Sequence, residues 1–102
     1  MKRVIVLYGQ PKDPEAFEKH YQEVHIPLVR QMPNLKGFEY SRGKVAVAGD
    51  ADYYMVAMLT FESGEALKES FASEAGKATV GDVGNFASGG ATIVTVGTTE
   101  GL

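Results

Sequence analysis

The order of strand-like and helix-like segments restricts this 102-residue chain to few possible folds. Four segments are rich in β-branched and apolar residues and are bounded by glycine, proline or aspartate, as is typical of strands. Two other segments carry apolar residues at steps of three and four, as is typical of amphipathic helices. The predicted strands are 2–8, 35–47, 53–61 and 91–96, and the predicted helical regions are 13–33 and 63–86.

This order, strand, helix, strand, strand, helix, strand, predicts an α+β ferredoxin-like βαββαβ fold, an antiparallel sheet with both helices on one face. The whole chain, residues 1–102, is expected to form one domain. A sheet with one wet face should alternate apolar with polar residues, yet the first strand has Val4 and Val6 on one face and Ile5 and Leu7 on the other. Since no third layer remains in the sequence, we expect a second copy to cover the free face, as a homodimer.

Charge and composition exclude several classes of protein. The net charge of −3 and the absence of any basic block argue against nucleic-acid binding. With no cysteine there are no disulfides and no thiolate ligands, which fits a reducing, cytoplasmic location. The first apolar run is too short for a signal peptide and no run is long enough to cross a bilayer, so no membrane association is expected.

The segment 13–33 predicts a helix with a well-defined start, because Asp13 can accept hydrogen bonds from the free amides of the first turn and Pro14 suits the first position. Pro27 lacks an N–H and predicts a kink or an early end. The expected core-facing stripe consists of Phe17, Tyr21, Val24 and Leu28. In the second helical region, Ser63 is the expected N-cap, and Gly76, Gly81 and Gly84 predict a break or a second short helix that ends near Phe86.

Both histidines lie in the first helical region. At about 100° per residue, His20 and His25 fall on opposite borders of the apolar stripe, roughly 140° apart, so they are not expected to face each other. Metal motifs of the H-E-x-x-H type need histidines four residues apart on one face, and no metal site is predicted. Without further information, one histidine would be solvated and the other would make a structural hydrogen bond at the edge of the core.

Two stretches carry a family resemblance: Y-G-Q-P-K-D-P-E-A-F at 8–17 and H-Y-Q-E-V-H-I-P-L at 20–28. Together with the M-P-N-L that follows, they resemble the EthD family, named for ethyl tert-butyl ether degradation, within the dimeric α/β-barrel superfamily. Asp82 and Phe86 are similar to the second-helix region of that family. The resemblance implies a ferredoxin-like homodimer that handles small organic molecules in degradation or tailoring. Relatives of the family include cofactor-free oxygenases, lactone isomerases and polyketide cyclases or dehydratases.

The histidines and tyrosines of the chain are suited to proton transfer. A histidine titrates near neutral pH, and His25, near the Pro27 kink, is the predicted acid/base. Tyr21 or Tyr40 could donate a hydrogen bond to a developing oxyanion. The expected ligand-binding side chains are His20, Tyr8, Tyr54 and Asp82. The glycines form neither a dinucleotide-binding loop nor a P-loop, so no cofactor is predicted.

Three kinds of function compete. The first is an enzyme, either oxidoreductase-associated or a cofactor-free isomerase or cyclase. The second is a non-catalytic protein that binds a small molecule, or an accessory protein of a degradative oxygenase system. The third, an RNA-recognition module, shares the order of elements but is rejected, because the third strand lacks the basic, glycine and inner aromatic positions of the RNA-binding motif and the first strand lacks its base-stacking aromatic residue. The sequence does not decide between the first two.

Overall fold

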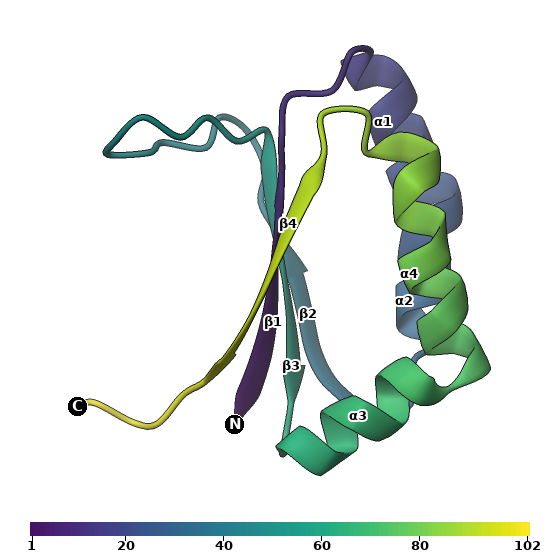
Figure 1. The fold of residues 1–102 in the computed structure, drawn as a ribbon, viewed down its shortest axis with the longest axis vertical. Coiled ribbons are helices and arrows are strands. Elements are labelled where there is room, and N and C mark those ends of the chain that lie inside the picture. The colour runs from purple at the N-terminus through teal and green to yellow at the C-terminus, as the bar shows by residue number, and fades with distance from the viewer.

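The computed structural model describes residues 1–102, and its element order confirms the ferredoxin-like fold (Figure 1). The elements are β1 (Lys2–Tyr8), α1 (Pro14–His20), η1 (Tyr21–His25), α2 (Ile26–Arg30), β2 (Leu35–Tyr40), β3 (Met55–Phe61), α3 (Gly64–Ala72), α4 (Glu74–Phe86) and β4 (Ala91–Gly97). None of the helices has the combination of length and apolar character that a bilayer crossing requires.

The four strands form one antiparallel sheet in the order β2-β3-β1-β4, with Val4 of β1 opposite Leu59 of β3 and Thr95 of β4. The predicted hairpin between β2 and β3 is confirmed. All helices cover the same face of the sheet, and the other face carries no element (Figure 1).

The second strand is shorter than the sequence predicted. It ends at Tyr40 rather than near residue 47, and Arg42 does not continue it. Gly43 has a φ of 73°, a left-handed conformation that interrupts the extended pleat. The following segment, 41–54, contains no strand and projects to the side of the sheet opposite the helices (Figure 1).

A core of 13 buried hydrophobic residues lies between the sheet and the helices. Alternate residues of β1 and β3, such as Val4, Tyr8 and Leu59, point into it. On the uncovered face, Ile5, Leu7 and the equivalent residues of β3 remain only partly buried. The free face of the sheet is therefore apolar, as the strand pattern predicted. The assignment of residues 1–102 to a single domain stays a prediction.

The first helical region begins as expected, with Asp13 Oδ1 accepting a hydrogen bond from the Ala16 amide at 3.1 Å. It then widens into one π-helical turn, η1, in which the Ile26 amide donates to the Tyr21 carbonyl five residues earlier. Pro27 is the second residue after this turn and has no N–H to donate to Glu23. The irregularity next to Pro27 is therefore a π turn, and the predicted early end does not occur, because α2 continues to Arg30.

The π turn also corrects the predicted core stripe. Phe17 and Tyr21 are buried as expected, but Val24 is 41% exposed and Leu28 is only partly buried. The buried residues after the turn are His25, Ile26 and Val29. A π turn holds one residue more than an α-helical turn, so every later position is displaced around the axis relative to an α-helical wheel.

The second helical region divides at Ser73 into α3 and α4. Ser63 caps α3 as predicted, and Ser73 Oγ caps α4 by accepting from the Gly76 amide at 3.0 Å. Of the three glycines, Gly76 lies at this corner, where a Cβ would overlap the Ser70 carbonyl oxygen. Gly81 and Gly84 do not interrupt α4; the predicted break lies at Ser73 and, as predicted, the second helix ends at Phe86.

Candidate functional site

The carboxylate of Asp82 joins two histidines from the neighbouring helical region. Asp82 lies on α4 and its side chain is 6% exposed. Its Oδ1 accepts a hydrogen bond from His20 Nε2 at 2.8 Å, and its Oδ2 accepts one from His25 Nδ1 at 2.9 Å. The Asn85 side-chain amide also donates to Oδ1, at 3.0 Å. The four side chains therefore form one connected polar cluster.

The prediction that His20 and His25 would not face each other was wrong. An α-helical wheel separates residues five apart, whereas the i→i+5 hydrogen bonding of η1 brings such residues close to one line along the axis. Both rings consequently point toward α4, where Phe86 packs 4.7 Å from the His25 ring and 5.4 Å from the His20 ring, centroid to centroid. The structural cause is the single π turn.

The charges of the cluster fix the direction of its hydrogen bonds. Burial alone would raise the pKa of Asp82, but the hydrogen bonds from Asn85, His20 and His25 outweigh it and hold that pKa below its usual range. Burial lowers the pKa of His25, although its contact with Asp82 opposes this shift. At neutral pH the pair is therefore an ionised carboxylate and a neutral imidazole. Because a carboxylate only accepts, the ring hydrogen of His25 lies on Nδ1, and Nε2 carries a free lone pair.

His25 also lines a small cavity between the sheet and the helices. The cavity has a volume of about 40 Å³, and 12 of its 14 lining residues are hydrophobic. No lysine, arginine, aspartate or glutamate lines it. The side chain of His25 is 5% exposed and that of His20 is 27% exposed, so His25 is the inner histidine of the cluster and His20 the outer one.

Two predicted tyrosines line the same cavity. Tyr8 comes from β1 and Tyr21 from η1, and the Tyr21 ring stacks on the His25 ring at 5.3 Å. Burial raises the pKa of both hydroxyls, and the negative charge of Asp82 raises that of Tyr8 further. Both therefore stay protonated and able to donate. The Tyr21 hydroxyl is fully buried and has no partner in full hydrogen-bond geometry, but it donates weakly toward the Tyr8 hydroxyl, which raises the pKa of Tyr21 further.

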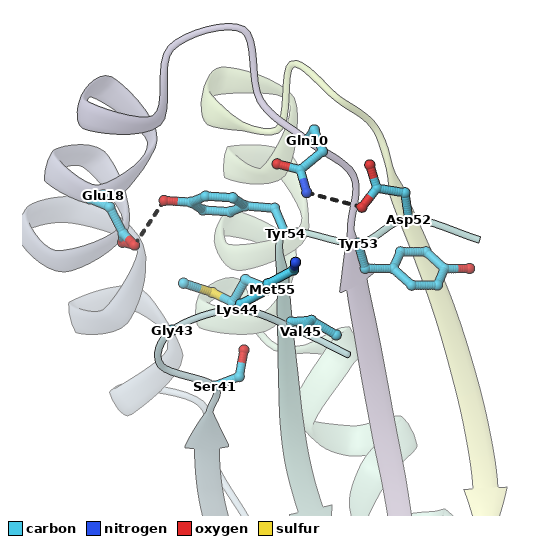
Figure 2. Close-up of a pocket in the computed structure, with 10 residues that line it drawn as sticks. All are labelled: Gln10, Glu18, Ser41, Gly43, Lys44, Val45, Asp52, Tyr53, Tyr54 and Met55. Carbon is cyan, nitrogen blue, oxygen red and sulfur yellow. Dashed lines mark hydrogen bonds between the residues drawn. The ribbon is translucent and has the colours of Figure 1, made fainter. Parts of the chain in front are cut away.

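The other two predicted tyrosines lie outside this cavity. The Tyr40 hydroxyl accepts a hydrogen bond from the Gln22 amide at 3.3 Å on the outer surface. Figure 2 shows Tyr54 in a separate, polar cleft of about 360 Å³, where its hydroxyl donates to Glu18 at 3.1 Å. Neither hydroxyl is in the group that surrounds His25.

Asn85 is the member of the cluster that the sequence analysis missed. It stands three residues after Asp82 on α4, a spacing that places two side chains on one helical face. That spacing was the available signal, but the glycines around it concealed the continuous helix. No group of three or more histidine or acidic side chains is arranged to hold a metal ion.

The fold agrees with the comparison to known families. Residues 9–90 match the model of the EthD domain, so the chain belongs to the EthD family. A protein of Rhodococcus erythropolis, described as an uncharacterized 11.0 kDa protein in the thcB-thcC intergenic region, is 40% identical over 94 residues, which cover 92% of this chain and 91% of that protein.

Solved structures give the same assignment. The crystal structure of an EthD family protein from Bacillus halodurans superposes with a TM-score of 0.87 at 29% identity and covers 97% of this chain and 99% of that one. A dimeric ferredoxin-like protein of unknown function from Thermobifida fusca superposes with a TM-score of 0.69 at 14% identity, covering 95% and 90% of the two chains. The second likeness is one of fold alone.

Proposed function

We propose that this EthD-domain protein is a cofactor-free enzyme that moves a proton on a small organic molecule, with His25 as the acid/base. The observation that carries the proposal is the Asp82–His25 pair at the wall of an apolar cavity. The carboxylate holds the ring through Nδ1, which leaves Nε2 as a base that water does not surround.

The site contains the groups that this proton transfer needs. Nε2 takes a proton from a carbon next to a carbonyl group, or from a hydroxyl, and the imidazolium that forms is stabilised by the ionised Asp82. The electron pair moves onto the substrate oxygen, where the Tyr21 hydroxyl donates a hydrogen bond to it. His25 then returns the proton to the same atom or to another one, which gives exchange or isomerisation without an oxidant.

The small volume of the cavity favours a second candidate. A space of about 40 Å³ must widen before an organic molecule fits, so the site could also hold a ligand without converting it, as a binding or accessory protein would. From the EthD resemblance we also propose an association with oxidoreductases.

The homodimer is part of the proposal as well. The uncovered, apolar face of the sheet and the description of related folds as dimeric support it. Packing sheet to sheet would remove the half-buried side chains of Ile5, Leu7 and Met58 from water.

Deuterium exchange tests the catalytic proposal. Small ketones are incubated with the protein in D₂O, and NMR follows the loss of their α protons. We expect His25→Gln to lower the exchange rate by about 10² or more, since glutamine keeps hydrogen bonding but cannot move a proton near neutral pH. Lys19→Gln, an exposed change on the same helical region, is the control. Protein-catalysed exchange that is equal in the wild type and in His25→Gln would contradict the assignment of His25.

A further inference from the structure

The polar atoms of the cavity define the kind of molecule that it can take. Of its two non-hydrophobic lining residues, Thr79 uses its hydroxyl to donate to the Ala75 carbonyl at 2.8 Å, within its own helix. The other is His25, whose Nδ1 is held by Asp82. The other side-chain polar atoms of the lining residues are His25 Nε2 and the hydroxyls of Tyr8 and Tyr21, which make up only a small part of a mostly apolar wall.

One of these atoms is unsatisfied. The Tyr21 hydroxyl is completely buried and has only a weak contact with the Tyr8 hydroxyl, short of full hydrogen-bond geometry, so this buried donor carries an energetic penalty. A ligand oxygen that accepts this hydrogen would remove the penalty, because the group is already dehydrated. The rings of Phe17, Tyr8 and His25 pack around Tyr21 and fix the direction of its side chain.

The cavity has no charged side chain that would pair with a charged ligand. No cationic side chain lines it, and the nearby ionised Asp82 already disfavours negative charge at Tyr8. A carboxylate or phosphate placed here would be buried without a partner, which is costly.

The cavity opens between α4 and β4. On this side Val80 is 49% exposed and Ile93 is 54% exposed, although both line the cavity. The hydrocarbon part of a ligand can pack against these two side chains while its polar end reaches inward.

We infer that this site binds an uncharged, mostly hydrocarbon molecule bearing a carbonyl or hydroxyl oxygen, which enters between α4 and β4 and places its oxygen at Tyr21 and the adjacent C–H or O–H at His25. This inference rests on the site of the proposed function, but it concerns the class of ligand and not the reaction.

Three probes of similar size test it: acetophenone has a neutral carbonyl oxygen, ethylbenzene has no oxygen, and benzoate is an anion. Affinities are measured by chemical-shift titration of the ¹⁵N-labelled protein. We expect acetophenone to bind about 10-fold more tightly than either of the others, which is the worth of one buried hydrogen bond. Shifts should concentrate at Val80, Val83 and Ile93.

Tyr21→Phe supplies the decisive variant, since phenylalanine keeps the ring and its packing. It should weaken acetophenone binding by about 5- to 10-fold and leave ethylbenzene unchanged. If Tyr21→Phe does not fold, Tyr8→Phe takes its place, and it should likewise weaken the binding of acetophenone. Tyr53→Phe, in the separate cleft of Figure 2, is the matched control and should change nothing.

The inference is overturned if benzoate binds as tightly as acetophenone, if neither tyrosine variant alters the preference for acetophenone over ethylbenzene, or if no probe shifts the cavity resonances. Exchange of the acetophenone methyl protons in D₂O separates this result from the proposed function. Tyr21-dependent binding without exchange supports the ligand class and removes the catalysis, whereas His25-dependent exchange that is unchanged in Tyr21→Phe supports His25 as the acid/base and removes Tyr21 as the group that holds the ligand oxygen.

Discussion

His25 donates its Nδ1 hydrogen to Asp82 over 2.9 Å, from the π turn to the helix packed against it. This contact does two things at once. It fixes the ring hydrogen on Nδ1 and leaves the lone pair on Nε2, and it ties η1 to α4 through groups far apart in the sequence.

The first prediction concerns the tautomer of His25. In Asp82→Asn the side chain at 82 has no charge and can donate as well as accept, so it no longer enforces the Nδ1–H form. We expect ¹⁵N NMR of the ring to show a shift toward the Nε2–H form, together with a fall of about 10² in any His25-dependent exchange rate. If the ¹⁵N chemical shifts of the His25 ring are the same in Asp82→Asn as in the wild type, Asp82 does not orient the histidine.

The second prediction is a dependence of stability on pH. The pKa of His25 is lower in the folded protein than its ordinary value of 6.5, so its contribution to stability is fully present above pH 6.5 and is lost as the pH falls toward the folded-state value. We expect the free energy of unfolding in urea to decrease between pH 7 and 5, by at most about 1.4 kcal/mol per pH unit for this group.

The matched variant for that measurement is His25→Gln, which carries no titrating ring. Its free energy of unfolding should fall less over the same pH range. An identical slope in the two proteins would assign the effect to other groups.

The third prediction concerns the corner between α3 and α4. Gly76→Ala would place a methyl group against the Ser70 carbonyl and should lower the free energy of unfolding by about 1–3 kcal/mol. Gly81→Ala is the control, because a Cβ there has open space and the helix should gain about 0.5–1 kcal/mol. Equal effects of the two changes in thermal or urea unfolding would mean that the corner tolerates a side chain.

The fourth prediction is the oligomeric state. The homodimer through the free sheet face should bury at least about 1,200 Å² in total, and Met58→Asp or Val56→Asp should dissociate or misfold it by burying an unpaired charge. Val24→Asp, on the outward side of η1, should leave the dimer intact. Light scattering that shows a dilution-resistant monomer for the wild type would refute the interface.

The fifth prediction tests Pro27. In Pro27→Ala the new amide can donate to Glu23, which favours an α-helical turn over the π turn. The melting temperature should hold or rise while ligand binding falls, because His25 loses its position relative to Asp82. Calorimetry and the acetophenone titration measure the two effects, and unchanged binding would make Pro27 irrelevant to the site.

Local signals predicted the fold well. The caps at Asp13 and Ser63 and the apolar pattern of β1 act within a few residues, and the structure has each of them as expected. The site was harder to predict from the sequence, because it depends on a turn with unusual hydrogen bonding and on a contact between residues 25 and 82. An α-helical wheel assumes regular bonding, so it placed the two histidines apart and Val24 in the core.

The π turn also affects how related sequences should be compared. A protein with the same fold but a regular first helix would have one residue fewer between Tyr21 and Ile26, since the extra residue is accommodated within the helix and not in a loop. An alignment that keeps gaps out of helices would then pair His25 with a neighbouring position and miss its counterpart. The counterpart of His25 in a relative is then found by allowing a one-residue insertion at this point.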